Sequence, residues 1–279
     1  MIDECIHGLD RDRCDACSPK APPTPAAAKS PVKRAAARTT TSLRTTPSSL
    51  RAPAAKSSAA KRAASAAPAK PVPNLGEQRI YHVTHASNLP GILGSGALNA
   101  EPSPVTDISS EEARTARRAT TVAGPDSATV AEHVPFYLSP NARLWESMRA
   151  GSTDPRLAPT AHGLAAAEFV ILVSTVKTVA TDEASIVVTD GDAAGQLTRF
   201  AATDETWKRL LYRLISDDES DALLSAEFLV KDSVPFDAVT LIGVPHDRAR
   251  DAVKLALSGS SHVPRVAVHP PWFAVPTED

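Results

Sequence analysis

Apolar and polar positions begin to follow regular patterns near residue 79. Residues 79–84 alternate and are rich in strand formers, which predicts a first β-strand. Asn88 can cap a short helix that follows, with Pro90 in its first turn and Gly96 at its stop. Residues 169–174 are almost continuously apolar, which indicates a strand buried on both faces. The chain beyond residue 79 therefore predicts a folded body that contains both strands and helices.

Strands outnumber helices in the second half of the chain. Their irregular alternation favours an α+β fold with a mixed sheet over a doubly wound one. The polar stretch 105–132 is predicted to be a long active-site loop, because long loops are usually functional. The other strands are predicted at 133–138, 185–189, 226–230, 238–243 and 265–269. The other helices are predicted at 110–119, 143–149, 206–215 and 246–257.

The first part of the chain lacks the residues needed for a core. None of the aromatic residues precedes Tyr81, and residues 20–74 contain 11 basic side chains and no acidic one. Prolines recur throughout this stretch and interrupt any long helix. We interpret residues 19–76 as a disordered basic linker rich in Ala, Pro, Ser and Lys, placed between residues 1–18 and a folded domain at 77–279.

The formal net charge of −2 conceals two segments of opposite charge. Residues 1–74 contain 13 basic and 5 acidic side chains, whereas residues 75–279 contain 17 basic and 27 acidic ones. A basic arm attracts the phosphate backbone of nucleic acids without reading their sequence. A linker whose charges merely keep it solvated explains the composition as well, and the sequence leaves both interpretations open.

All three cysteines lie within the first 17 residues. Cys5, His7, Cys14 and Cys17 have the spacing C-x-H-x6-C-x2-C, and four thiolate or imidazole ligands suit a structural zinc ion. We therefore predict a zinc knuckle at residues 1–18. The alternative is an N-terminal peptide with free thiols that binds no metal.

Several classes of protein are disfavoured by the sequence. The folded part contains no cysteine, so no disulfide framework supports it, and the chain shows neither a signal peptide nor a membrane-length apolar run. We therefore expect a soluble protein of the cytoplasm that does not bind membranes. Common signatures such as G-x-G-x-x-G, the P-loop, G-x-S-x-G and H-E-x-x-H are absent.

Taken together, segments spread over residues 80–273 resemble the DarT family of NAD-dependent DNA ADP-ribosyltransferase toxins. Their order and spacing carry the resemblance, since no single segment is specific. They are Tyr81–His85, Asn88–Leu93, Gly96–Leu98, Arg117-Arg118, Val134–Tyr137, Phe169–Ser174, Val188–Asp190, Ala226-Glu227 and Trp272-Phe273. The resemblance implies an ADP-ribosyltransferase fold, NAD as co-substrate, single-stranded DNA as acceptor and a macrodomain antitoxin of the DarG type as partner.

The resemblance also assigns roles to particular residues. Glu227 corresponds to the catalytic glutamate, whose carboxylate stabilises the positive charge that develops on ribose as nicotinamide leaves. The essential arginine falls at Arg117-Arg118; we favour Arg118, as a clamp on the NAD diphosphate or on the DNA. NAD binding is assigned to His82, Val83, Thr84, Gly91, Leu98, Asn99 and Tyr137.

Without the resemblance, each of these residues has an ordinary structural interpretation: His82 as a satisfied core histidine, Glu227 as an outward-facing residue of an edge strand, Tyr137 as core. Residues 140–145 and His133 depart from the family pattern, which leaves the acceptor base open between thymine and guanine. The predicted activity is therefore transfer of ADP-ribose from NAD to a base in single-stranded DNA. The alternatives are an ADP-ribosyltransferase that acts on RNA or protein and a non-catalytic nucleic-acid-binding module of the same fold.

Overall fold

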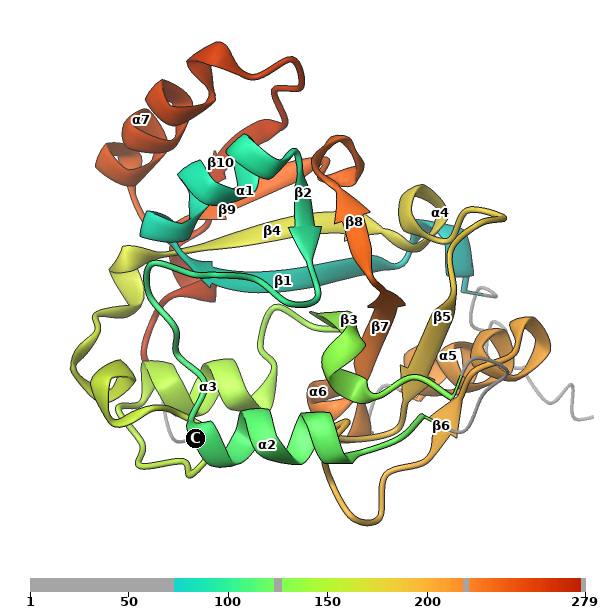
Figure 1. The fold of residues 1–279 in the computed structure, drawn as a ribbon. Helices are drawn as coiled ribbons and strands as arrows, with labels where there is room; N and C mark the ends of the chain where they lie inside the picture. The colour runs from blue at the N-terminus through green and yellow to red at the C-terminus, as the bar shows by residue number, and fades with distance from the viewer. Residues whose placement is uncertain (1–72, 123–126, 218–220, 277–279) are drawn as a thin grey trace, which may run out of the picture. The chain divides into compact units, whose positions relative to one another are not determined.

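The computed structural model of the protein describes residues 73–122, 127–217 and 221–276. Within these ranges the chain forms an eight-stranded sheet and a separate two-stranded sheet, with helices packed around them (Figure 1). The prediction of an α+β fold with a mixed sheet is confirmed. The predicted zinc knuckle and most of the predicted basic linker lie outside the described residues.

Almost all the predicted elements are present, with boundaries that differ by a few residues. The strands are β1 (Arg79–His85), β2 (Ala97–Asn99), β3 (His133–Tyr137), β4 (Phe169–Thr175), β5 (Ile186–Thr189), β6 (Phe200–Ala201), β7 (Glu227–Lys231), β8 (Ser233–Pro235), β9 (Leu241–Val244) and β10 (Arg265–Val268). The helices are α1 (Leu89–Ser95), α2 (Glu111–Ala119), α3 (Arg143–Arg149), α4 (Val176–Val179), α5 (Asp204–Ser216), α6 (Ala222–Ser225) and α7 (Asp247–Ala256). The elements without a prediction, β2, β6, β8, α4 and α6, have two to four residues each. Such segments are too short to show a period.

The large sheet has the strand order β10-β9-β4-β1-β3-β7-β5-β6. The β9 and β10 strands are parallel, and every other neighbouring pair is antiparallel. β1 pairs with β4 from Arg79 to His85 but with β3 only at Tyr81, opposite Tyr137. Figure 1 shows β1 and β4 on one side of this junction and β3, β7 and β5 on the other. The sheet therefore opens between β1 and β3 beyond Tyr81.

Alternation along β7 decides which way Glu227 faces. Phe228 and Val230 are buried in the main core, where Phe228 packs edge-on against Trp207 of α5. Leu229 belongs instead to a small cluster on the opposite face of the sheet. Since side chains alternate along a strand, Glu227 shares the face of Leu229 and is directed away from the main core.

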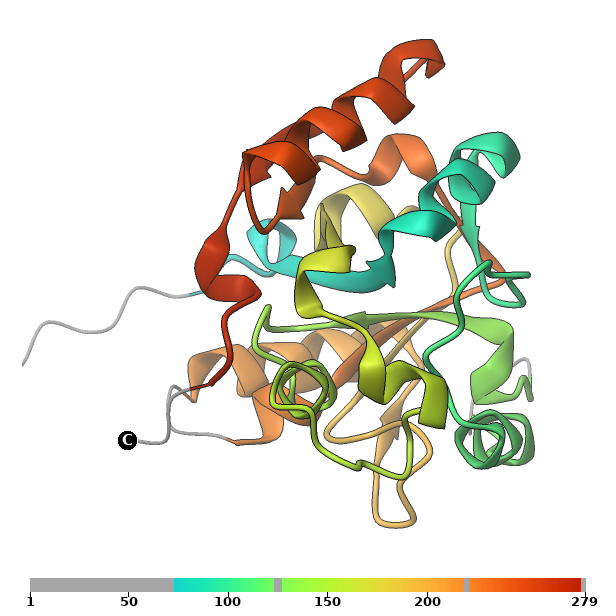
Figure 2. The same ribbon diagram turned by 90° about the vertical axis from the view of Figure 1, so that its left-hand side faces the viewer.

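A second apolar cluster lies between the sheet, α3 and the C-terminal segment, whose approach to the sheet is visible in Figure 2. Trp145 of α3 packs against Phe169 and Phe273, and its indole N–H donates to the carbonyl of Trp272 at 2.7 Å. A Cβ at Gly243 would lie 2.7 Å from the Trp272 ring, so glycine permits the close approach. These contacts fix the segment that follows β10.

Arg149, the last residue of α3, has a structural role in the same cluster. Its side chain is buried and donates to the carbonyls of Pro271 and Ala274 and to Oδ1 of Asn141. We expect Arg149→Met to lower the free energy of unfolding by about 2 kcal/mol, because the charge-assisted hydrogen bonds that the buried guanidinium donates to the C-terminal segment are lost. Thermal denaturation would measure this. Arg143→Met, on the exposed side of α3, is the control and should change stability little; equal losses for the two variants would contradict this role of Arg149.

Candidate active site

A cavity of about 490 Å³ opens on the face of the sheet toward which Glu227 is directed. Its walls come from α2, β3, α3, α6, the start of β7 and loop residues between these elements. Three residues predicted from the sequence line it, namely Arg117, Tyr137 and Glu227. Pro135, Arg156 and Asp192 line it as well. The structure thus brings carboxylates, guanidinium groups and a phenol together in one concave site.

Glu227 is held at both its backbone and its side chain. It begins β7, its exposed fraction is 4%, and its backbone N–H donates to Oγ1 of Thr189 at 2.9 Å. Its Oε1 accepts from the backbone N–H of Ala193 at 2.9 Å. A carboxylate this deeply buried needs such partners, because an unpaired one would carry a large desolvation cost. The position of the carboxylate is therefore fixed by β7, β5 and the loop that follows β5.

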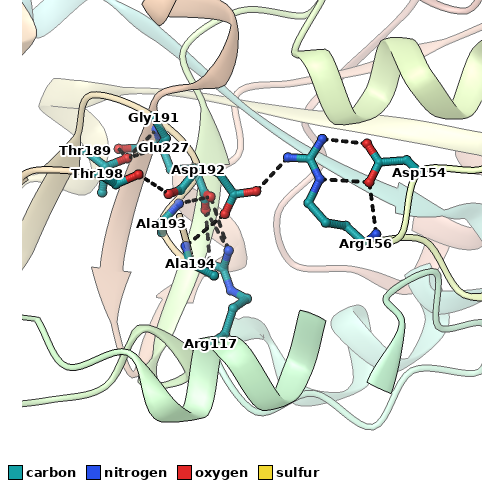
Figure 3. A network of polar contacts seen from close by, with 10 residues as sticks. All are labelled: Arg117, Asp154, Arg156, Thr189, Gly191, Asp192, Ala193, Ala194, Thr198 and Glu227. Atoms are coloured by element: carbon teal, nitrogen blue, oxygen red, sulfur yellow. Dashed lines mark hydrogen bonds and ion pairs between the residues drawn. The ribbon is translucent and has the colours of Figure 1, made fainter. Parts of the chain in front are cut away.

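Arg117 forms the ion pair that balances this charge. Ser110 caps α2 by accepting from the N–H of Ala113, and the helix presents Arg117 to Glu227, as Figure 3 shows. Nη1 of Arg117 lies 3.2 and 3.1 Å from the two carboxylate oxygens, and Nη2 lies 3.0 Å from Oε2. Burial alone would lower the pKa of Arg117, but the Glu227 carboxylate outweighs it and leaves the pKa above its ordinary value. Arg117 therefore holds its proton in this arrangement.

Arg118, the arginine favoured from the sequence, is directed elsewhere. Its side chain is 60% exposed and pairs with Glu111 on the outer side of α2. Consecutive helical residues differ by about 100° in direction, so only one of the two can face the cavity. The structure places Arg117 against Glu227 and Arg118 toward solvent.

The Glu227 carboxylate has no spare acceptor position. Oε1 faces the Ala193 N–H and Nη1 of Arg117, and Oε2 faces both Nη1 and Nη2 of Arg117. A carboxylate offers about four lone-pair positions, and four contacts fill them here. A substrate hydroxyl can bind Glu227 only if Arg117 gives up part of this contact.

Tyr137 lies beside the carboxylate because Tyr137 and Glu227 are paired residues of β3 and β7. Burial, reinforced by the nearby Glu227 charge, raises the pKa of Tyr137 well above its ordinary value. The phenol therefore stays neutral, and Tyr137 lines the cavity beside Glu227.

His82 spans the opening between β1 and β3. Its Nδ1 lies 2.9 Å from the carbonyl oxygen of Pro135, and a carbonyl accepts only, so Nδ1 must carry the proton. Burial lowers the pKa of His82, with the Pro135 carbonyl acting against it. Nε2 of the neutral ring is then an acceptor. With Nδ1–H donated to Pro135, the neutral ring has no second N–H to offer, and Nε2 can only accept a hydrogen bond.

The lowered pKa of His82 makes stability depend on pH. The native state binds a proton at His82 less readily than the unfolded chain, so stability is lost as pH falls from 6.5 toward the lowered pKa. His82→Asn can keep the bond to Pro135 but cannot titrate. We expect this variant to lose less stability than the parent protein between pH 7 and pH 5. Urea denaturation at several pH values measures this, and equal losses would exclude His82 as the source.

Of the predicted NAD-binding residues, Tyr137 lines this cavity, whereas His82 and the others do not. Thr84 is buried, and its Oγ1 accepts from the side-chain amide of Asn88. Asn88 also bonds both the N–H and the carbonyl of Thr106, which ties the loop after β2 to β1. Leu98 belongs to the main core. Gly91 and Asn99 are exposed, and Val83 packs at the edge of the α3 cluster.

Two functional features are not apparent from the sequence alone. The Ala193 N–H contacts the predicted catalytic carboxylate, and Arg156 joins Asp192 to Asp154 at the cavity wall (Figure 3). The turn signal Asp190-Gly191 after a buried strand could have pointed to the first, because loops at strand ends often carry sites. No local pattern marks Arg156.

Within the part of the chain that the structure describes, no group of three or more His, Cys, Asp or Glu residues could hold a metal ion. The predicted zinc ligands Cys5, His7, Cys14 and Cys17 lie outside that part. No helix among the described residues is long and apolar enough to cross a membrane.

Comparison with known proteins finds matches that span most of the folded domain. Residues 81–274 match the family described as "ssDNA thymidine ADP-ribosyltransferase, DarT". The chain is 30% identical over 215 residues to a DNA ADP-ribosyl transferase of Thermus aquaticus, spanning 74% of this chain and 91% of that protein. The structure of DarT from Thermus sp. 2.9 in complex with ADP-ribosylated ssDNA superposes with a TM-score of 0.60 at 24% identity, covering 71% of this chain and 96% of that one. The same DarT in complex with NAD+ gives a TM-score of 0.57 at 24% identity, with 71% and 98% covered.

Proposed function

The chain belongs to the DarT family of single-stranded-DNA ADP-ribosyltransferases, and from this premise we propose how its own residues carry out the reaction. The protein is an NAD-dependent DNA ADP-ribosyltransferase. It transfers ADP-ribose from NAD to a base of single-stranded DNA, and nicotinamide is the leaving group. The alternatives, a transferase acting on RNA or protein and a non-catalytic binding module, have no specific support in the site.

The observation that carries the assignment of residues is the buried Glu227 carboxylate in the wall of the cavity. As the bond from ribose to nicotinamide breaks, positive charge develops on the sugar. A fixed carboxylate stabilises that charge and accepts a hydrogen bond from a ribose hydroxyl. The Ala193 N–H and the start of β7 hold the carboxylate in place before substrate arrives.

Arg117 is the arginine that we assign to the reaction. It occupies the acceptor positions that a ribose hydroxyl needs, so it must release part of its contact with Glu227 when NAD binds. A guanidinium freed in this way suits the diphosphate of NAD or a DNA phosphate. Arg118 is too exposed, and too far round the helix, to take this role directly.

The remaining NAD contacts are assigned to the opening between β1 and β3. Nε2 of His82 would accept from a ribose hydroxyl, while Thr84 and Asn88 hold the adjoining loop. Tyr137 offers its ring face to nicotinamide or to the acceptor base. Val83, Gly91, Leu98 and Asn99 stay proposals that rest on the family resemblance alone.

Thymine is the proposed acceptor base, with guanine second, since the matching family is described by thymidine. A base that is already unpaired enters a pocket without the cost of leaving a duplex. The reaction is proposed to occur in the cytoplasm as the toxic activity of a toxin–antitoxin or phage-defence system. A macrodomain antitoxin of the DarG type is the proposed partner, and Cys5, His7, Cys14 and Cys17 are proposed zinc ligands on their spacing alone.

Labelled NAD distinguishes this function from its alternatives. The protein is incubated with NAD labelled in the adenylate part and with single-stranded DNA, RNA or a cellular protein fraction. We expect label on DNA alone. Label on RNA or protein in preference to DNA would indicate the other transferases, and no label with no nicotinamide release would indicate a binding module.

The basic N-terminal segment gives a further prediction. The folded domain carries an acidic excess, so long-range attraction to DNA falls to the basic residues before residue 73. Deleting residues 1–72 should leave NAD hydrolysis intact and weaken DNA modification, increasingly so as salt rises from 50 to 200 mM. Equal DNA modification by both proteins at every salt concentration would contradict this role.

A further inference from the structure

Arg156 is a guanidinium in the cavity wall that the proposed mechanism does not use. It lies on the loop between α3 and β4 and has an ordered set of contacts. Its Nε and Nη2 donate to the two carboxylate oxygens of Asp154 at 2.9 and 2.7 Å. Its Nη1 donates to Oδ2 of Asp192 at 2.6 Å. Figure 3 shows Arg156 between these two aspartates, beside Glu227 and Arg117.

The charges around Arg156 exclude an obvious role. A guanidinium at the edge of a site for NAD and DNA would ordinarily be interpreted as a phosphate ligand. Here two carboxylates already face one cation, so the group as a whole carries a negative charge. A phosphate would have to displace Asp154 or Asp192 from a bond shorter than 3 Å. The geometry favours a different task.

That task concerns the loop between β5 and β6, residues 190–199. The loop is folded around Asp192, whose carbonyl accepts from Thr198 Oγ1 and from the N–H of Gly195. The Asp192 side chain accepts from the N–H of Ala194 through Oδ1 and from Arg156 through Oδ2. Gly195 allows this tight turn, because a Cβ there would lie 2.7 Å from Thr198 Oγ1.

The residue after Asp192 touches the reactive carboxylate. Ala193 is fully buried, and its N–H donates to Oε1 of Glu227 at 2.9 Å. The consecutive residues Asp192 and Ala193 therefore link Arg156 to Glu227: Asp192 contacts Arg156, and Ala193 contacts Glu227. A shift of the Asp192 side chain would move the Ala193 N–H and so change the orientation of the carboxylate.

We propose that Arg156 is a positioning residue: it anchors Asp192 so that the Ala193 N–H holds Glu227 in the orientation required for cleavage of the ribose–nicotinamide bond. The inference rests on the proposed function of Glu227 and deepens it. A fixed carboxylate matters because misplacement of a catalytic group by about 1 Å can cost on the order of 100-fold in rate. Asp154 serves in turn to keep Arg156 extended toward Asp192.

The test compares Arg156→Gln, Asp192→Asn and the double variant in two reactions, NAD hydrolysis with water as acceptor and modification of a single-stranded oligonucleotide. We expect each single variant to lower kcat of both reactions by about 10- to 100-fold, with KM for NAD changed less than about 3-fold. The double variant should be no slower than the slower single variant, because both break the same link. Arg156→Lys should recover part of the rate.

Arg250→Gln is the matched control. Arg250 on α7 is as exposed as Arg156, at 34%, and also faces two aspartates, Asp247 and Asp251, but it lies outside the cavity. The Arg250→Gln variant should leave the rates of NAD hydrolysis and DNA modification unchanged. The melting temperature of each variant identifies any loss of activity that comes from unfolding. If Arg156→Gln is unstable, the rates of Arg156→Lys are compared with those of the parent protein instead.

Two outcomes would overturn the inference. If Arg156→Gln raises KM for DNA and leaves NAD hydrolysis unchanged, Arg156 is a DNA ligand. If the losses from Arg156→Gln and Asp192→Asn multiply in the double variant, the two residues do not act through one link. Failure of the proposed function is distinguishable, because the parent protein itself would then neither release nicotinamide nor modify DNA.

Discussion

Glu227→Gln should reduce both NAD hydrolysis and DNA modification by about 100- to 1000-fold, the scale seen when one preorganised electrostatic group is removed from an active site. The amide has the shape of the carboxylate and can keep the bond from the Ala193 N–H. It cannot stabilise positive charge on ribose. Release of nicotinamide and transfer of label to an oligonucleotide measure the two losses.

A control separates this chemical loss from unfolding. The amide leaves the guanidinium of Arg117 without its anion, and breaking a buried ion pair destabilises by about 3 kcal/mol or more. The double variant Glu227→Gln with Arg117→Met removes both charges and should recover stability without recovering activity. Activity of Glu227→Gln within about 3-fold of the parent protein would exclude Glu227 as the catalytic carboxylate.

The second large effect should distinguish two neighbouring arginines. Arg117→Gln should lower the rate of DNA modification by about 100-fold or more, because Arg117 balances the Glu227 charge and is the guanidinium proposed to turn to a phosphate when NAD binds. Arg118→Gln should change the rate by less than about 3-fold, since Arg118 is exposed and pairs only with Glu111 in the part of the chain described here.

Arg117→Gln and Arg118→Gln serve as controls for each other, because both remove one positive charge from neighbouring positions of α2. Arg117→Gln also leaves a buried carboxylate without its cation, so its free energy of unfolding should fall while that of Arg118→Gln stays near the parent value. Urea denaturation measures both. A larger loss of activity for Arg118→Gln would restore the assignment favoured by the sequence.

Elements with a clear period could be predicted from the sequence. The alternation in residues 79–84 corresponds to β1, the apolar run at 169–174 to β4, and the pattern at 89–96, with Pro90 in the first turn and Gly96 at the stop, to α1. The predicted cap by Asn88 is wrong, because its side chain bonds Thr84 and Thr106 and makes no cap hydrogen bond. The opening between β1 and β3 could not be predicted, because it depends on which strands become neighbours. The single pairing of Tyr81 with Tyr137 and the His82 bond to Pro135 arise only in the folded sheet.

The site likewise contains residues that could be predicted from the sequence and contacts that could not. Glu227 and Arg117 are far apart in the chain, and no periodicity says that they meet; the family resemblance placed both at the site but favoured Arg118. The direction in which α2 presents its side chains places Arg117 beside Glu227 and favours Arg117 over Arg118. The Asp190-Gly191 turn signal marks the loop that carries the Ala193 N–H, but no pattern shows that this backbone donor meets Glu227. Arg156 has no sequence signature, because a single arginine after a proline resembles any surface residue.

Mass spectrometry of defined oligonucleotides tests the central claim most directly. Single-stranded DNA with one thymine, one guanine or neither is incubated with NAD and with the parent protein or Glu227→Gln. We expect one added ADP-ribose on the oligonucleotide that contains thymine, dependent on NAD and lost with Glu227→Gln. No adduct on any oligonucleotide, or the same adduct with Glu227→Gln, would contradict the claim that this cavity transfers ADP-ribose to DNA through Glu227.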